Sequence, residues 1–429
     1  MKPSAIVDPD TYVDGVPHEL FTQLRQEAPL VWVDEPPIDD WPAGPGFWAV
    51  LRHAEAAHVL RTPQIFSSSA GLTQIYDAPP PLLPVLRTMM INMDPPEHSR
   101  LRGLLTKAFT PRAVALLEER IRHRAEDLVD AMAERGACDF ARDIAADLPL
   151  YTLADVLGVP ASDRWLMFDW ANRVIGVLDD EYRNSSAFDP STATEMARRA
   201  LEVRPKPDAD GRMPDSRRPD GMADLYAYAR ELGEYRRREP GDDIMSLLMQ
   251  QDGGRVSVEE FERLFWLFSV AGNETVRNAL PGGMLALLHN PDVYRRLGDD
   301  RTLLNRAVEE MLRWWTPVIQ FRRTAVADAT VGGVPVRAGD KVVVYFSSAN
   351  RDETVFAEPD RFDIDRDPNP HLAFGHGPHF CVAAHLARVQ MRALFTAVLD
   401  RLGEVEPAGP VTWQNSVFIC GPRSMPVRF

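Results

Sequence analysis

Cys381 ends a short glycine-rich segment, Phe374-Gly-His-Gly-Pro-His-Phe-Cys381. A thiol binds iron strongly only as thiolate, and a helix N-terminus favours thiolate because its unpaired N–H groups carry positive potential. A helical pattern runs from Val382 to Leu402, directly after the cysteine. Gly375 and Gly377 permit a tight turn through which the backbone approaches a flat cofactor. A buried cysteine is more often a plain core residue, so the segment alone leaves both interpretations open.

A second group with chemical potential is Ala271-Gly-Asn-Glu-Thr275, in the middle of an apolar helical stretch. Glycine inside a helix costs about 1 kcal/mol relative to alanine, and close approach of a ligand to the backbone is one reason for it. The carboxyl group of Glu274 and the hydroxyl group of Thr275 follow, and such a pair can relay protons in a dry pocket. The alternative is an ion-paired carboxylate beside a hydroxyl bonded to its own helix carbonyl.

The elements that must position these groups are mostly helices. Ser257-Val-Glu-Glu260 is a capping box that opens the stretch Phe261–Leu288, which is apolar on nearly all sides and is expected deep in the fold. Pro281-Gly-Gly predicts a kink or break in it. Further helices are expected at Pro95–Phe109, Pro111–Arg135, Asp139–Leu157, Asp163–Leu178, Met222–Arg238 and Arg301–Trp315.

Extended patterns are few, and they occur at Leu30–Val33, at Gly46–Leu51 and between Phe321 and Phe346. The sequence therefore predicts a mainly α protein with small β-sheets. A polar segment rich in Pro, Gly, Asp and Arg, Arg204–Gly221, interrupts the helices. We expect a mobile lid insertion around residues 181–221, and the alternative is an ordinary flexible surface loop.

Composition narrows the class of protein. The chain has 429 residues, 45% of them apolar, which suffices for one large core or two ordinary ones. The net charge of −15 argues against nucleic acid as the main partner. The three cysteines are far apart and odd in number, which argues against a disulfide framework. No stretch has the ~20 apolar residues of a membrane span, and the start has no signal-peptide pattern, so we expect a soluble cytoplasmic protein.

The pattern Phe374-x-x-Gly377-x-x-x-Cys381 resembles the haem-binding loop of the cytochrome P450 family. Ala383 stands where the family usually has glycine. Glu310-Met-Leu-Arg313 resembles the Glu-x-x-Arg pair of the family, and Arg361 in Pro359-Asp-Arg-Phe362 resembles the arginine that completes this structural triad. The resemblance runs through nearly the whole chain. It implies the cytochrome P450 fold, one domain over residues 1–429, and haem b with Cys381 as the axial ligand of the iron.

The resemblance also implies which residues hold the haem. Its two carboxylates need cationic or hydrogen-bonding partners. His98, Arg102, Arg323 and His379 match positions that contact these carboxylates in the family. Without the cysteine loop, His98 and Arg102 read as a solvated helix face. Ala271, Gly272, Phe374 and Gly375 are expected to contact the cofactor as well.

Glu274 and Thr275 resemble the acid–alcohol pair of the family, with Val276 where a second hydroxyl residue often follows. The resemblance implies a monooxygenase that uses O2 for hydroxylation or epoxidation. Peroxide-driven members commonly replace the acid, so we expect electrons from a separate ferredoxin and ferredoxin reductase. Candidate docking cations are Lys107, Arg112, Arg388 and Arg392, and the equally favoured alternative is that these are scattered surface charges. The alternatives are a peroxide-driven peroxygenase and a non-catalytic haem-thiolate sensor.

The substrate is the least determined feature. Apolar residues implied to face it are Leu72, Ile75, Met90, Val174, Leu267, Phe268, Val318, Ile319 and Phe418, although each one alone reads equally well as core. An apolar pocket binds an apolar substrate, here a steroid, terpenoid, polyketide or lipid. Two stretches, at 271–278 and 415–424, look most like bacterial members that act on steroids, terpenoids or methyl-branched lipids. We expect a monomer.

Overall fold

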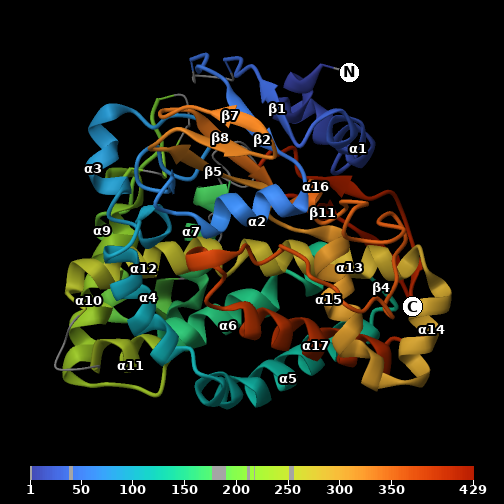
Figure 1. Ribbon diagram of the computed structural model, residues 1–429. Coiled ribbons are helices and arrows are strands. Elements are labelled where there is room, and N and C mark those ends of the chain that lie inside the picture. Colours follow the sequence, from blue (N-terminus) through green and yellow to red (C-terminus); the bar gives the residue numbers. More distant parts are fainter. Residues whose placement is uncertain (1, 38–41, 176–189, 210–212, 217, 251–255) are drawn as a thin grey trace.

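The computed structural model describes residues 2–37, 42–175, 190–209, 213–216, 218–250 and 256–429. Helices make up most of it, as predicted, and the strands form small sheets (Figure 1). The helices outside the centre are α1 His18–Glu27, α2 His53–Arg61, α3 Leu83–Leu86, α4 Glu97–Ala108, α5 Pro111–Ala133, α6 Asp147–Leu157, α7 Arg164–Ile175, α9 Glu195–Glu202, α10 Ala223–Arg238, α11 Ile244–Gln250, α14 Pro291–Asp299, α15 Leu304–Trp315, α16 Phe346–Ala349 and α17 Ala384–Arg401.

Two central helices, α12 Val258–Ala271 and α13 Glu274–Leu288, follow one another across the middle of the molecule (Figure 1). The main sheet lies above them in this view, and α6, α17 and α5 lie below. Ser257 and Glu260 form the predicted capping box, with both reciprocal hydrogen bonds present. Most residues of α13 are buried, as expected for a helix that is apolar on nearly all sides.

The main sheet has five strands in the order β1-β2-β8-β5-β3. Only the pair β2 and β8 is parallel. Successive side chains of a strand point to opposite faces, so Phe321 and Arg323 of β5 share one face and Arg322 takes the other. The strands are β1 Leu30–Val33, β2 Phe47–Val50, β3 Phe66–Ser67, β5 Gln320–Ala325 and β8 Lys341–Tyr345.

Three smaller sheets accompany it in the described part of the chain. They consist of β4 Ala137–Asp139 with β12 Pro426–Arg428 and β9 Glu406–Pro407, of β6 Ala329–Val331 with β7 Val334–Val336, and of β10 Thr412–Trp413 with β11 Pro422–Ser424. No helix among the described residues is long and apolar enough to cross a membrane.

The break in the central helix is not where the sequence predicts it. Pro281 lies inside α13, and the interruption is at Gly272 and Asn273 instead. A Cβ on Gly272 would lie 3.0 Å from Cδ1 of Leu153, so α6 packs tightly against the backbone here. Pro281 removes one helical N–H, and Gly282 after it packs so closely on Trp315 of α15 that a Cβ would overlap the indole ring. Tertiary packing therefore retains the helix at Pro281.

The prediction of one helix over Asp139–Leu157 is wrong in its first half. Residues 137–139 form β4, residues 140–144 form a π-helical turn, and α6 begins only at Asp147. The carboxylate of Asp139 accepts hydrogen bonds from the backbone N–H groups of Ala141, Arg142 and Met425. This pairing with the C-terminal strand is a long-range contact that local periodicity cannot reveal.

The structural triad contains Arg366 and not Arg361. Glu310 and Arg313 are fully buried and joined by two hydrogen bonds of 2.8 and 2.7 Å, as the Glu-x-x-Arg pattern predicts. The guanidinium of Arg366 completes the cluster at 3.3 Å from Glu310. The side chain of Arg361 is 63% exposed and pairs with Glu358. Its backbone carbonyl is the group that contacts Arg313, at 3.2 Å.

The polar insertion is described only in part, since residues 181–189, 210–212 and 217 lie outside the described residues. The two ends of the polar segment Arg204–Gly221 contact α7. Arg204 pairs with Asp169 at 2.7 Å, and the carbonyl of Gly221 accepts a hydrogen bond from Arg173 at 3.3 Å. Mobility of this segment stays a prediction.

Candidate active site around Cys381

A cavity of about 240 Å³ lies where β5, the central helices and the cysteine loop meet. Most residues predicted for the site line it. From the groups assigned to cofactor and iron these are His98, Arg102, Ala271, Gly272, Arg323, Phe374, Gly375, His379 and Cys381. Thr275 lines it too, together with Met90, Leu267, Phe268 and Val318 from the group assigned to the substrate.

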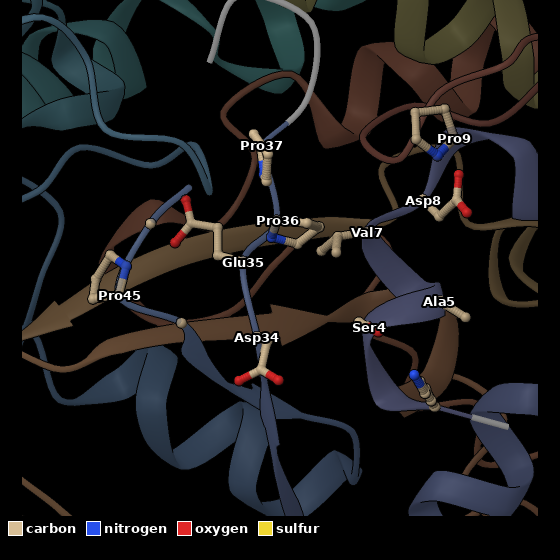
Figure 2. Close-up of a pocket in the computed structure, with 13 residues that line it drawn as sticks. Ser4, Ala5, Val7, Asp8, Pro9, Asp34, Glu35, Pro36, Pro37 and Pro45 are labelled. Carbon is tan, nitrogen blue, oxygen red and sulfur yellow. The ribbon is translucent and has the colours of Figure 1, made fainter. Parts of the chain in front are cut away.

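A second hollow, of about 660 Å³, lies near the N-terminus and is more open to solvent. Figure 2 shows its wall of prolines and acidic side chains, among them Asp8, Asp34 and Glu35. Its described lining contains none of the residues predicted for the site. The chemistry is therefore expected in the smaller cavity at Cys381.

The backbone around Cys381 is a tight loop. The N–H of Cys381 donates to the carbonyl of Phe374 at 2.9 Å. Gly377 has a φ of +69°, and a Cβ on it would lie 2.3 Å from the carbonyl oxygen of Leu60, so only glycine fits there. Helix α17 begins at Ala384, slightly later than the predicted Val382. The N–H of Ala383, the N-cap residue of this helix, hydrogen-bonds the sulfur.

Burial raises the pKa of the Cys381 thiol, and the N–H of Ala383 with the cations Arg102 and Arg388 oppose this effect. Arg388 is fixed by two hydrogen bonds to Glu309, of 2.6 and 2.7 Å, and its guanidinium lies 4.5 Å above the ring of Phe374. A buried thiol with cations and an N–H group near it becomes thiolate when a metal cation binds.

Two cations that face the cavity have no carboxylate partner among the described residues. Burial lowers the pKa of Arg102 and brings that of Arg323 to about 10. Arg323 is 5% exposed, and the hydrogen bond that its guanidinium makes within the described chain goes to the backbone carbonyl of Arg322. Asp94 acts on Arg323 electrostatically without pairing with it. A buried cation with no carboxylate in contact is costly, which fits a ligand that brings two carboxylates.

Two histidines lie beside these cations. The rings of His98 and His379 are 4.0 Å apart. Burial and neighbouring Arg side chains lower the pKa of His98 to about 4 and that of His379 to about 2, so both are neutral at pH 7. Nδ1 of His98 is buried and has no partner in the described chain. The donor set therefore fits a flat, dianionic cofactor held through iron and sulfur, which is a haem.

The acid and the alcohol are the first two residues of α13, directly after the break, but only the alcohol lines the cavity. Thr275 lines the cavity and donates to the carbonyl of Ala271 at 2.9 Å. Glu274 is 1% exposed and does not line the cavity. One of its oxygens lies 3.3 Å from both Asn273 and Arg277, and the other has no partner in the described chain. The carboxyl group is therefore buried outside the cavity lining.

Burial raises the pKa of Glu274, and Arg277 opposes this rise only in part. A carboxyl group with a raised pKa in the folded state binds more protons there than in the unfolded state, so it lowers stability as pH increases. We expect Glu274→Gln to remove this dependence. Denaturation at pH 5 and pH 8 should show a larger loss in the free energy of unfolding for the wild type than for Glu274→Gln as pH rises. Parallel pH profiles for both proteins would contradict the assignment.

Some residues predicted for the substrate pocket are elsewhere. Ile75 and Ile319 pack in a separate core cluster with Tyr345. Leu72 is buried with a φ of +65° and does not line the cavity. The ring of Phe418 contacts that of Phe321, at a centroid distance of 5.4 Å, and so stands behind a lining residue. The side chain of Val174 lies outside the described residues.

The structure adds lining residues that sequence reasoning missed. These include Thr73, Ile91, Phe109, Leu153, Val156, Phe321 and Gln390. Thr73 and Ile91 stand next to the predicted Leu72 and Met90 in the sequence. Alternation along β5 was the available signal for Phe321, which shares a face with the predicted Arg323. Leu153 and Val156 are on α6, whose approach to Gly272 no pattern in the sequence indicates.

A mainly α fold around a cavity that is lined by a cysteine and by two cations without carboxylate partners in the described chain is typical of a haem-thiolate protein. The family model "Cytochrome P450" matches residues 227–409. The chain is 36% identical over 408 residues to a steroid C26-monooxygenase of Rhodococcus jostii, covering 94% of this chain and 79% of the relative. It is 37% identical over 421 residues to a methyl-branched lipid omega-hydroxylase of Mycobacterium bovis, covering 96% and 91%.

Solved structures agree with the sequence comparisons. Cytochrome P450 CYP268A2 of Mycobacterium marinum, in complex with pseudoionone, matches with a TM-score of 0.84 and 36% identity over 100% of this chain and 99% of that chain. The chain therefore belongs to the cytochrome P450 family, which confirms the resemblance seen in the sequence. It is a monooxygenase, an oxidoreductase that uses O2, redox partners and a haem-thiolate cofactor on a lipophilic substrate.

Proposed function

We propose that this protein binds haem b through the thiolate of Cys381 and inserts one oxygen atom of O2 into an apolar small molecule. The observation that carries the proposal is the placement of Cys381, which is partly buried and lines a cavity together with apolar side chains and two cations without carboxylate partners in the described chain. The reaction is hydroxylation of an unactivated C–H bond or epoxidation.

The haem is held at three kinds of contact. Cys381 ligates the iron, and Arg102, Arg323, His98 and His379 take the carboxylates. The flat faces of the haem pack against cavity-lining residues in this proposal, namely Ala271, Gly272, Phe374 and Gly375. When bound, the haem supplies the site at which O2 is reduced and one oxygen atom becomes reactive.

Thr275 and Glu274 deliver protons in this proposal. Thr275 lines the cavity, and its hydroxyl group, whose proton goes to the carbonyl of Ala271, accepts a hydrogen bond from an ordered water in this proposal. Glu274, the neighbouring residue, is buried outside the cavity lining, and its raised pKa favours a carboxyl group that carries a proton to pass on. The apolar lining from Leu267 and Phe268 keeps other water out.

The substrate is proposed to be a steroid, terpenoid, polyketide or lipid. The lining is mainly apolar, with Met90, Leu267, Phe268, Val318 and Phe321. Two relatives act on a steroid and on a methyl-branched lipid, and one solved relative binds pseudoionone.

Electrons are proposed to come from a separate ferredoxin and ferredoxin reductase, and the protein to act as a cytoplasmic monomer. The thiols Cys138, Cys381 and Cys420 are free, which suits a reducing compartment. Of the docking cations expected from the sequence, Lys107 and Arg112 are exposed, whereas Arg388 is engaged by Glu309.

Reconstitution tests this proposal against a peroxide-driven enzyme and a sensor. Haem-loaded wild type is expected to oxidise a terpenoid or steroid with ferredoxin, its reductase and O2. Glu274→Gln should reduce this product about a hundredfold and divert O2 to hydrogen peroxide, while peroxide-supported turnover changes little. Turnover with peroxide but none with ferredoxin, its reductase and O2 would favour a peroxygenase. A thiolate-type carbonyl spectrum without turnover under either condition would favour a sensor.

A further inference from the structure

Thr73 is a buried polar residue of the cavity that the proposed mechanism does not use. It lies in the segment 70–92 between β3 and α4, is 3% exposed, and lines the cavity together with Met90 and Ile91 of the same segment. The other polar groups that line this cavity among the described residues are His98, Arg102, Thr152, Thr275, Arg323, His376, His379, Cys381 and Gln390.

The hydroxyl proton of Thr73 has a fixed direction. Oγ1 of Thr73 donates to Oδ1 of Asn92 at 2.8 Å, and Nδ2 of Asn92 donates to the carbonyl of Leu86 at 3.0 Å. The reverse orientation of the Asn92 amide would set its oxygen against the oxygen of Leu86, so the amide cannot turn over. Oγ1 of Thr73 therefore keeps only its acceptor lone pairs for a molecule in the cavity.

Turning the hydroxyl proton of Thr73 away from Asn92 would cost free energy. If Thr73 turned to donate to a ligand, Oδ1 of Asn92 would stay buried without a donor, since Asn92 is 6% exposed. Thr152 differs. Its hydroxyl donates to the carbonyl of Leu148 in its own helix at 2.8 Å, and a helix carbonyl keeps its backbone partner when a side-chain hydroxyl turns away.

The place of Thr73 is fixed by the sheet beneath it. Its carbonyl accepts from the N–H of Arg322 at 2.9 Å. Two residues further on, the carbonyl of Ile75 accepts from both Arg322 and Lys341 at 3.1 Å. The carboxylate of Asp77 pairs with the same two cations, at 2.6 and 2.8 Å. Thr73 is therefore held on a rigid support, as a recognition group must be to discriminate between ligands.

The two cations beneath the segment 70–92, Arg322 and Lys341, are themselves held by ion pairs. Arg322 is 3% and Lys341 is 2% exposed. Lys341 also pairs at 2.7 Å with Glu35, which is 4% exposed and forms part of the wall of the hollow in Figure 2. Buried charges with partners on both sides hold their geometry because displacing one leaves another unpaired.

We propose that Thr73 makes the cavity selective for apolar molecules that carry a hydroxyl group over the corresponding ketones. An alcohol donates its proton to Oγ1 of Thr73, whereas a ketone presents a second acceptor to an atom that has no proton to give. This inference rests on the proposed function and specifies its substrate class. One hydrogen bond of this kind corresponds to about a tenfold preference.

Calorimetric titration of the haem-loaded protein with matched pairs tests the inference. The probes are borneol and camphor, β-ionol and β-ionone, and a 3β-hydroxysteroid with its 3-ketosteroid. For each probe pair that binds, the alcohol should bind about tenfold more tightly than the ketone to the wild type, to Thr73→Ser and to the control Thr152→Val. Thr73→Val should bind both members equally. Asn92→Leu frees the hydroxyl proton and should raise ketone affinity to that of the alcohol.

Equal affinities in wild type, a preference that survives in Thr73→Val, or a preference lost in Thr152→Val would each overturn the inference. Calorimetry does not depend on turnover, so an intact preference without oxidation products contradicts the proposed function and supports the role of Thr73. Failure of all six probes to bind contradicts the apolar substrate class and this inference together.

Discussion

Cys381→Ser is expected to reduce donor-driven oxidation to background and to remove the thiolate-type red shift of the reduced carbonyl adduct. Serine keeps the size of the side chain, but its oxygen is far more basic and stays protonated in a site where burial already raises the pKa of the thiol. The Arg102, Arg323 and histidine contacts remain, so some haem should still bind without the sulfur ligand. Absorption spectroscopy of the reduced carbonyl complex measures the change.

Cys138→Ser is the matched control for this experiment. Cys138 is also buried, and burial raises its pKa to about 12, but it lies in β4 away from the cavity lining. The control is expected to keep the wild-type carbonyl spectrum and turnover. An unchanged spectrum in Cys381→Ser, or the same spectral loss in both variants, would refute Cys381 as the iron ligand.

The cysteine loop could be predicted because its requirements are local. A turn with glycine at positive φ, a cysteine, and a helix start occur within a few residues, and sequence spacing records them directly. The pair Glu310 and Arg313 is readable for the same reason, since residues three apart share one face of α15. The mainly α class follows from long periodic segments.

Features that depend on distant contacts could not be predicted. The helix break at Gly272 is related to the approach of Leu153 from α6, and the π-turn after Asp139 to pairing with the C-terminal strand. Ile75 and Ile319 have the apolar character of pocket residues, but they pack against Tyr345 on the other side of the sheet. Composition cannot tell the two faces of one strand apart.

There is a physical reason why Arg366 takes the place in the triad that the sequence analysis predicted for Arg361. The chain from Pro359 to Arg361 turns its carbonyls toward Arg313, with oxygens 2.9 and 3.2 Å from the guanidinium. A backbone that presents its carbonyls inward sends the side chain of Arg361 outward, to Glu358. The cation that neutralises Glu310 must then come from further along the chain, and Arg366 is the residue that returns to it.

Arg366→Ala is therefore expected to lower the free energy of unfolding by about 3–5 kcal/mol, because it leaves the carboxylate of Glu310 buried with one cation fewer. Arg366 also donates to the carbonyl of Ala357 at 2.7 Å, so its loss frees the segment that leads to the cysteine loop. Arg361→Ala, five residues earlier, removes only an exposed pair with Glu358 and should cost about 0.5 kcal/mol or less.

Denaturant titration of the two variants measures this difference, and haem retention during dialysis measures its effect on the site. Arg366→Lys separates charge from geometry: it keeps a cation near Glu310 and should recover part of the loss, since one ammonium cannot reproduce the fork that bonds both Glu310 and the carbonyls around it. Equal destabilisation by Arg361→Ala and Arg366→Ala would restore Arg361 to the triad. Because Glu310 contacts neither the cavity nor Cys381, haem loss in Arg366→Ala would show that this buried charge cluster supports the cofactor through the backbone alone.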